Sequence, residues 1–271
     1  MGRVVVERDE YGEVTDTGFV ELTTAEKEAA LEAAADGKVH AATNGIFNNE
    51  EAAAKYAAQH TTADDAPQYV AYFPEADNAI SELLIAGYQH YMEGDTLGLT
   101  NATKKVKTLM KRYGKTGLHL DGHSRGGITT GNAIESLNNE AGNRGSARET
   151  SVHLFGSAYN AQEMANELYT LSGDSPGADA RVRQSTHKAD FVGTLIGGNE
   201  ATGGRIPDGS SRTRERLKIP FADDTVHSSY ATRQGFENSK DEKRMAIKNY
   251  WGREYSPLLP VLPTISKGGS K

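Results

Sequence analysis

The sequence predicts an α/β fold, with a mostly parallel sheet that carries helices on both faces. Between Gln68 and His187, short apolar runs that suit strands alternate with longer amphipathic runs that suit helices. This alternation indicates right-handed crossovers between parallel strands. The chain has 271 residues, of which 37% are hydrophobic, so it can bury one large core and still carry a small appendage.

The first part of the chain, residues 1–66, is expected to form the appendage. The run GRVVVERDEYGEVTDTGFVELT turns around Asp9 to Gly12 and indicates a hairpin of two short strands. The run TAEKEAALEAAADGK predicts a surface helix that begins at Thr24 and stops at Gly37. A second helix is expected at 49–60, after a turn over TNGIFNN and before a linker over 61–68.

The second part, residues 67–271, is expected to form an α/β domain. Its pattern predicts strands at 69–73, 117–122, 150–156 and 180–187. Helices are expected at 75–94, 99–115, 126–140 and 160–173, and the second of these has its cap at Thr100 or Asn101. After Asp190 the sequence becomes glycine-rich and irregular, and a last helix is expected at 240–251.

Composition and charge exclude several classes of function. The formal net charge is −7 and the pI is near 5.7, which disfavours a nucleic-acid partner and a nuclease-type toxin. The chain has 0 cysteines, so disulfides, thiolate metal sites and cysteine nucleophiles are excluded. It shows no signal-peptide pattern and no apolar run that could span a bilayer, so we expect a soluble domain; if it acts outside the cell, a larger parent protein or a separate export system must carry it there.

We expect no metal and no nucleotide cofactor. The sequence lacks HExxH, clustered His/Asp spacing and a GxGxxG after a strand. The glycine-rich run LIGGNEATGGRIPDGSS also lacks the Gly-Lys-Ser/Thr ending of a P-loop. Two interpretations of that run stay open, a flap over the active site within 196–220 and a plain surface loop.

The stretch LHLDGHSRGGITTGNAIESL places Ser124 between an expected strand and an expected helix. Gly122 and Gly126 flank the serine two residues to each side, where larger side chains would obstruct a sharp turn. At such a turn the hydroxyl is exposed at the end of the strand, and the N–H of Arg125 can point at a developing oxyanion. Ser124 is therefore the predicted nucleophile; the alternative is a tight turn in which it only caps the helix.

A serine nucleophile on such a sheet needs an acid and a histidine later in the chain. His227, in the polar run FADDTVHSSY, is the predicted base because an acid can then lie between it and Ser124. His187 is the alternative base, whereas His153 lies within an expected strand and is interpreted as a hydrogen-bonded core imidazole. His119 and His123 flank the turn, and the side chain of His123 is expected to point elsewhere.

Asp190 is the predicted acid because it follows a strand by a few residues. That position projects from the carboxyl edge of the sheet toward the turn that holds Ser124. The competing carboxylates lie in an expected surface loop or next to the histidine: Asp174, Asp179, Asp223 and Asp224.

The oxyanion needs a second backbone donor beside that of Arg125. The loop after the 69–73 strand is expected to lie beside the turn, so Phe73 or Glu75 is the candidate donor; Pro74 has no N–H. The side chain of Arg125 could bind a substrate phosphate or form a salt bridge across the turn, and the second is the preferred interpretation. The basic helix over 99–115 is interpreted as amphipathic, with charges that are solvated or attract anionic lipid.

Several of these motifs resemble one enzyme family. LHLDGHSRGG resembles the nucleophile elbow of α/β-hydrolase lipases, whose common form is Gly-His-Ser-Leu-Gly-Gly, and it departs only at Arg125. VHLFGSAYNAQ and HKADFVGTLIGGN resemble the following strand and the acid-bearing segment of the class 3 lipase branch. The resemblance covers roughly residues 69–230 and implies a lipase or phospholipase A type of activity on lipid acyl esters.

A second resemblance concerns the biological context. TNGIFNNEEAAAKYAAQH, HLDGHSRG and LIGGNEATGGRIPDGSS together resemble the C-terminal effector regions of filamentous-haemagglutinin-type exoproteins, which deliver toxins by contact between bacteria. This resemblance implies a toxin domain that is secreted within a larger exoprotein and delivered into a target bacterial cell. It also implies a cognate immunity protein as a partner.

The sequence thus predicts a serine ester hydrolase in which Ser124, Asp190 and His227 form a catalytic triad. Its substrate is expected to be a lipid or phospholipid, met in transient contact with a membrane surface. Two alternatives stay open: a non-catalytic α/β interaction domain, and an esterase that acts on a small non-lipid ester.

Overall fold

The fold is α/β, as the sequence predicts, and its centre is an eight-stranded sheet. The structure, a computed structural model, describes residues 1–10, 14–45, 49–60, 67–74, 100–173, 181–202, 226–231 and 242–247. Across the sheet the strands follow the order β2-β1-β4-β3-β5-β6-β7-β8. Neighbouring strands from β4 to β7 run parallel, whereas β1, β2 and β8 pair antiparallel toward the two edges.

The expected N-terminal hairpin is confirmed, and it belongs to the central sheet. Strands β1 (Gly2–Arg8) and β2 (Val14–Glu21) pair with each other, and β1 also pairs with β4 (Gln68–Val70). Strand β3 (Val39–Thr43), which the sequence did not predict, lies between β4 and β5 (Leu118–His123). The sheet therefore takes strands from both 1–66 and 67–271.

The first helix is shorter than the sequence predicts. Helix α1 (Thr24–Glu28) begins with a capping box between Thr23 and Glu26, but it ends at Glu28 rather than near Gly37. The reason is that side chains from the body of the protein bind the backbone here in place of helical partners. The hydroxyls of Tyr113 and Tyr69 accept the N–H groups of Leu31 and Glu32, at 2.8 and 3.0 Å.

Four further expected helices are confirmed, whereas the one expected at 240–251 is not. They are α2 (Glu50–His60), α4 (Asn101–Tyr113), α5 (Arg125–Asn138) and α6 (Ala161–Leu171). Thr100 caps α4 and Asn160 caps α6. Strands β5, β6 (Thr150–Phe155) and β7 (Val182–Ser185) also lie where the sequence predicts them, and the expected helix at 75–94 lies outside the described residues.

Two expectations about the later strands and helices were wrong. The strand expected at 69–73 is β4, which ends at Val70. Within the expected helix at 240–251, residues 243–244 form strand β8 (Lys243–Arg244), which pairs with β7. The main sheet overrides the local helical pattern because the N–H of Met245 binds the carbonyl of Val182 at 2.9 Å, and Met245 and Ile247 are buried in the core.

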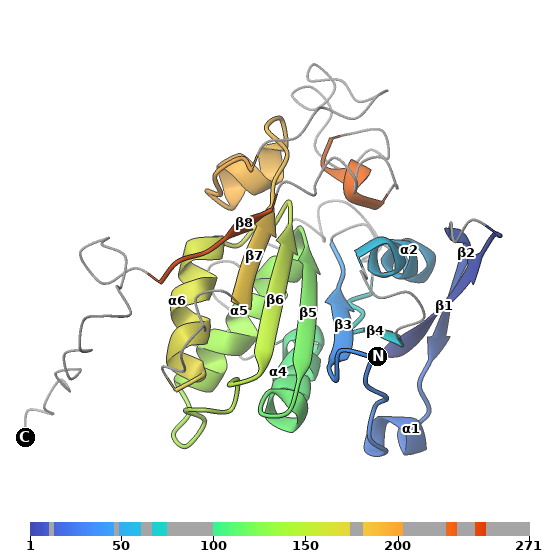
Figure 1. The fold of residues 1–271 in the computed structure, drawn as a ribbon, viewed down its shortest axis with the longest axis horizontal. Coiled ribbons are helices and arrows are strands. Elements are labelled where there is room, and N and C mark those ends of the chain that lie inside the picture. The colour runs from blue at the N-terminus through green and yellow to red at the C-terminus, as the bar shows by residue number, and fades with distance from the viewer. Residues whose placement is uncertain are drawn as a thin grey trace, which may run out of the picture.

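The hydrophobic core has two large parts. The larger cluster joins α4, α5 and α6 to the sheet through residues such as Leu109, Ile134, Leu168 and Leu120. The smaller cluster joins the alanines of α2 to β1, β3 and β4. Figure 1 shows α4, α5 and α6 together on one side of β5, β6 and β7, whereas α2 lies beside β3 and the hairpin.

The carboxyl ends of β5, β6 and β7 lie at the same edge of the sheet because these strands are parallel. Two short helical turns stand above this edge in Figure 1. They are η2 (Val192–Ile196), a π-helical turn that follows β7, and the 3₁₀ turn η3 (Ser228–Ala231). The three residues of the predicted triad therefore belong to segments that meet at one edge.

Helix α5 approaches β3 so closely that only glycine fits at position 126. A Cβ added to Gly126 would lie 2.2 Å from the carbonyl oxygen of Thr43. We expect Gly126→Ala to lower the free energy of unfolding by about 1–3 kcal/mol in urea titrations, because either the helix or the strand must move.

Gly18→Ala is the matched control. A Cβ at Gly18 would lie 3.8 Å from that of Val5, so this change is expected to stay within about 0.5 kcal/mol. Equal unfolding midpoints for Gly126→Ala and the unchanged protein would contradict the close packing of α5 on β3.

Candidate active site

Ser124 stands at the sharp turn between β5 and α5 in a strained backbone conformation. Its φ is 56° and its ψ is −122°, and within the described ranges it is the only residue other than glycine with a positive φ. Such a conformation costs about 1–3 kcal/mol. The Ser124 hydroxyl makes no capping hydrogen bond to α5, so a simple capping role does not explain the turn.

The strained turn is anchored to the end of the neighbouring strand β6. The N–H of Ser124 donates to the carbonyl of Phe155 at 3.1 Å. The carbonyl of Ser124 accepts from the N–H groups of Gly127 and Ala158 at 3.0 and 3.1 Å. These three hydrogen bonds hold the serine in place without using its side chain.

Asp190 and His227, although far apart in the sequence, form a buried hydrogen-bonded pair. Nδ1 of His227 lies 2.9 Å from Oδ1 of Asp190, and the exposed fractions of the two residues are 4% and 0%. The same carboxylate oxygen accepts the N–H groups of Val192 and Gly193 at 2.9 and 3.1 Å. The first turn of η2 thus orients the acid.

The electrostatics of this pair determine which ring nitrogen carries the proton. Burial raises the pKa of Asp190, but the interaction with His227 and the hydrogen bonds from Gly193 and Tyr230 outweigh it, so the pKa lies below its usual value. An ionised carboxylate can only accept, so Nδ1 of His227 must donate to it. Nε2 is then the nitrogen with a free lone pair, which is the tautomer a general base needs.

Tyr230 orients the second oxygen of the carboxylate, a role that the sequence analysis missed. Its hydroxyl donates to Oδ2 of Asp190 at 2.9 Å and accepts from the N–H of His187 at 2.8 Å. Gly156, directly after β6, makes room for this arrangement with a φ of 50°, because a Cβ there would lie 2.3 Å from Oδ2. The only sequence signal was the Phe-Gly pair at the end of the β6 strand.

His123 connects the serine turn to His227, contrary to the expectation that its side chain points elsewhere. Its ring stacks between those of Tyr56 and His227, at centroid distances of 4.1 and 4.8 Å. Its Nε2 lies 3.1 Å from the carbonyl oxygen of His227. Ser124 Oγ and His227 are not hydrogen-bonded in this arrangement. The serine turn and His227 are instead linked through the ring of His123.

Strand β3, rather than the strand of Tyr69, pairs with β5, but the chain after β4 still brings Phe73 beside the serine turn, where its ring lies 4.0 Å from the Arg125 guanidinium. The N–H of Phe73 donates to Oδ1 of Asn44 at 2.8 Å, and its carbonyl accepts from Nδ2 at 3.0 Å. The loop that begins at Asn44, after β3, therefore lies beside the same turn, because β3 is the neighbour of β5. No sequence signal marked Asn44, since TNGIFNN only predicted a turn.

Arg125 is buried, with an exposed fraction of 2%, and its guanidinium lies over the ring of Phe73 at 4.0 Å. One of its nitrogens donates to the carbonyl of Gly45 at 3.3 Å. The side chain thus joins α5 to the loops after β3 and β4. Its N–H belongs to the first residue of α5, where no helical carbonyl can accept it.

The other residues considered from the sequence have structural partners or lie outside the described ranges. His153 is confirmed as a hydrogen-bonded strand residue, with Nε2 at 2.9 Å from the hydroxyl of Ser185. His187 is buried and stacks on Tyr230 at 4.5 Å. Outside the described residues lie Glu75, Asp174, Asp179, Asp223, Asp224 and most of 196–220.

The basic side chains of α4 are only in part a solvated face, because the side chain of Lys107 is 15% exposed and that of Lys111 is 47% exposed. Lys107 and Lys111 both pair with Glu140.

Within the described ranges, no group of three or more His, Asp or Glu side chains has a geometry that could hold a metal ion. In the same part of the chain, no helix combines the length and apolar character needed to cross a bilayer.

No protein-family model matches the chain, and no curated protein shows significant similarity to it. The chemistry of the site must therefore be argued from its own residues.

The hydrogen bonds to Asp190 should make the free energy of unfolding depend on pH. Because the folded pKa is below the unfolded value of about 3.9, this carboxylate stabilises the fold fully above about pH 4 and loses its effect as the pH falls through the folded pKa. We expect Tyr230→Phe to raise the pKa of Asp190, so acid unfolding begins at a higher pH. At pH 7 the free energy of unfolding should fall by about 1–3 kcal/mol.

Circular dichroism between pH 7 and pH 2 measures both effects. Tyr56→Phe is the control, because that hydroxyl donates to the carbonyl of Ser228 and not to Asp190. An identical acid limb for Tyr230→Phe and Tyr56→Phe would show that the Tyr230 hydroxyl does not stabilise the ionised acid.

Proposed function

We propose that this protein is a serine ester hydrolase of the α/β-hydrolase type that cleaves lipid or phospholipid acyl esters. The observation that carries the proposal is the buried Asp190–His227 hydrogen bond at the sheet edge where the strained Ser124 stands. The chain order serine, acid, histidine is the order found in α/β-hydrolases. A purely structural role for this ion pair would not explain why Ser124 is held at a positive φ at the same sheet edge.

The topology supports the same assignment. Ser124 follows β5, a central strand flanked by β3 and β6, and Asp190 follows β7. Successive residues of β3, Ala41 and Ala42, belong to the two separate apolar clusters, which fits helices on both faces of the sheet. Nucleophile elbows in this fold class occupy the same kind of strand-to-helix turn.

In the proposed reaction, Ser124 Oγ attacks the ester carbonyl carbon while its proton passes to Nε2 of His227. The Asp190 carboxylate stabilises the imidazolium that forms. When the tetrahedral intermediate collapses, the C–O bond to the leaving alcohol breaks and Nε2 returns the proton to that alcohol. Water then attacks the acyl-enzyme with the same base, and the fatty acid leaves as Ser124 regains its proton.

The oxyanion would be bound by backbone N–H groups at the elbow. The N–H of Arg125 is one donor, as the sequence predicts. The Phe73 N–H is already bound to Asn44, so we propose that the second donor comes from the loop that begins at Asn44 after β3. The bond from Arg125 to the carbonyl of Gly45 would hold that loop against the elbow.

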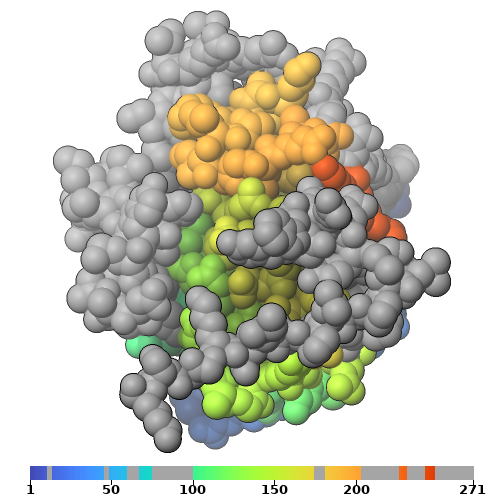
Figure 2. Space-filling model, turned by 90° about the vertical axis from the view of Figure 1, so that its left-hand side faces the viewer, coloured from blue at the N-terminus to red at the C-terminus, as the bar shows by residue number. Residues whose placement is uncertain are grey.

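A lipid substrate is supported by exposed apolar side chains next to the proposed acid. Phe191, Leu195 and Ile196 have exposed fractions of 39%, 67% and 47%, and they lie in or beside η2. Figure 2 shows the segment that carries them (orange) on the surface of one face. Such side chains can enter the apolar boundary of a lipid aggregate while the ester reaches Ser124.

The exoprotein resemblance supports a biological role for this activity. We propose an antibacterial toxin that is secreted within a larger protein and degrades lipid in the target cell. A producing cell would then need an immunity protein that blocks the site.

The first test is covalent labelling of Ser124 by a fluorophosphonate. We expect a single adduct on the peptide that carries Ser124, measured by mass spectrometry, and none in Ser124→Ala. His227→Ala should slow labelling and ester hydrolysis by at least about 1,000-fold, because it removes the proposed base.

His187→Ala serves as the comparison for the second histidine. Labelling that survives in His227→Ala but is lost in a folded His187→Ala protein would move the base to His187. An absence of labelling in the unchanged protein would favour a non-catalytic interaction domain.

A second test concerns the substrate class. Leu195→Ser should reduce hydrolysis of phospholipid vesicles several-fold but leave hydrolysis of a soluble short-chain ester unchanged, because only the first reaction needs contact with a lipid surface. Val20→Ser on β2 is the matched control, since Val20 is also exposed, at 55%.

Released fatty acid and lysolipid are measured by mass spectrometry in both assays. Equal activity of Leu195→Ser and Val20→Ser on vesicles would show that the exposed apolar side chains of η2 are not needed for lipid hydrolysis. Activity on the soluble ester alone would favour a small-ester esterase.

A further inference from the structure

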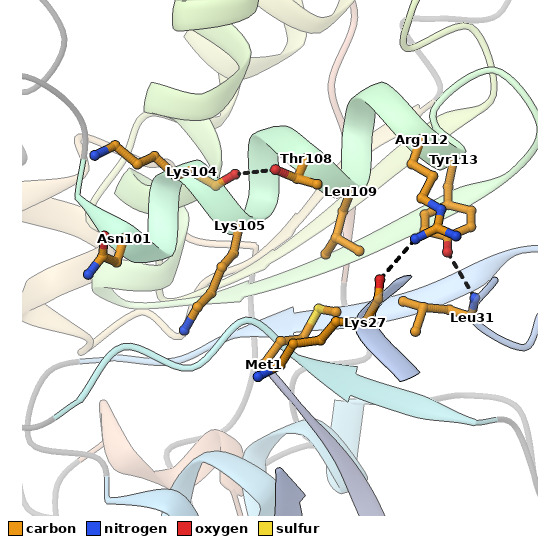
Figure 3. A pocket seen from close by; sticks show the side chains of 10 residues that line it. All are labelled: Met1, Lys27, Leu31, Asn101, Lys104, Lys105, Thr108, Leu109, Arg112 and Tyr113. Carbon is orange, nitrogen blue, oxygen red and sulfur yellow. Dashed lines mark hydrogen bonds between the residues drawn. The ribbon is translucent and has the colours of Figure 1, made fainter. Parts of the chain in front are cut away.

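A separate cavity of about 420 Å³ lies along one side of α4. Figure 3 shows its walls, which come from the length of α4, from α1 and from the chain that follows α1. Leu31, Leu109 and Tyr113 provide apolar surface, and the aliphatic stems of neighbouring lysines add to it. Cavities of this size accommodate small organic ligands.

The shape of the cavity depends on the early end of α1. Tyr113 binds the N–H of Leu31 at 2.8 Å, and Arg112 binds the carbonyls of Lys27 and Glu28 at 3.0 and 2.7 Å. These bonds hold the chain after α1 extended along α4 instead of continuing the helix. The apolar wall at Leu31 is therefore fixed by side chains of α4.

The charges around the cavity are of one sign. Among the described residues that line it, four are basic and none is acidic: Lys27, Lys104, Lys105 and Arg112. Lys27 pairs with Glu21 at 3.0 Å, but the other three have no carboxylate partner within the described part of the chain. Lys105 donates to the carbonyl of Tyr72 at 3.3 Å.

A protein with a net charge of −7 thus concentrates unbalanced positive charge beside an apolar cavity. We propose that the cavity binds a small anionic amphiphile, with one carboxylate and a single unbranched apolar chain, of the fatty-acid class. The chain contacts Leu31, Leu109 and Tyr113, and the carboxylate lies near Lys105, while Arg112 adds positive charge farther along α4. An inorganic anion would leave the apolar walls of the cavity exposed to water, and the basic side chains would repel a cationic amphiphile.

This site is distinct from the proposed catalytic residues. Its described lining comes from α1, α4, Leu31 and Met1, and it includes none of Ser124, Asp190 and His227. The proposal therefore does not depend on the hydrolase function. If that function also holds, a released fatty acid would be one ligand of the right class.

Isothermal titration calorimetry of the full chain with dodecanoate, below its micellar concentration, tests the proposal. We expect saturable binding at one site and no binding of dodecyltrimethylammonium. Lys105→Gln should weaken dodecanoate binding several-fold, and Lys105→Gln with Arg112→Gln by at least tenfold. Lys111→Gln is the matched control on the same helix, because Lys111 pairs with Glu140 outside the cavity, and its affinity should not change.

Thermal unfolding of each variant separates lost binding from lost folding, and Lys105→Gln is the decisive variant because Arg112 also holds the chain after α1. Equal affinity of Lys105→Gln and Lys111→Gln for dodecanoate would overturn the proposal. Loss of binding after fluorophosphonate labelling of Ser124 would also overturn it, because the ligand would then occupy the catalytic site. A protein that takes no label at Ser124 but binds dodecanoate as expected would leave this proposal standing alone.

Discussion

The buried carboxylate of Asp190 is the interaction on which the rest of the site depends. It accepts hydrogen bonds from His227, Tyr230 and the backbone at the start of η2, so it joins two distant parts of the chain at the edge of the sheet. A buried carboxylate that lost one of these donors would face a desolvation cost with less compensation. The same bonds keep Asp190 ionised, and that ionised form sets the tautomer of His227.

The elbow is the second constraint, and it acts through close backbone packing. Gly126 and Gly127 approach Thr43 and Ser157 so closely that a Cβ would not fit at either position. This packing, together with the bond from Ser124 N–H to Phe155, holds the serine at its positive φ. The neighbouring His123 then stacks on His227, so the serine turn and the acid–base pair share one packed layer.

Local signals predicted the elements around the site, whereas contacts between distant residues determined what the sequence analysis missed. The apolar run before Ser124 and the flanking glycines were enough to predict β5, α5 and the turn between them. The early end of α1 depends on Tyr113, which lies 82 residues from its partner Leu31, and no local pattern could reveal it. Strand β3 was hidden because its alanines resemble helix formers, and β8 because its pairing with β7 overrides a helical pattern. The contacts of Tyr230 with Asp190 and of Asn44 with Phe73 depend on how the strands pair, so no local pattern could predict them.

In the proposed mechanism, Ser124 forms an acyl-enzyme with His227 as the base. The most direct measurement is rapid-quench mass spectrometry of the intact protein mixed with a p-nitrophenyl acyl ester. We expect a burst of p-nitrophenol, a transient mass gain of one acyl group on the peptide that contains Ser124, and loss of both in His227→Ala. Ester turnover without any acyl adduct on Ser124, or an adduct that forms equally fast in His227→Ala, would contradict this mechanism.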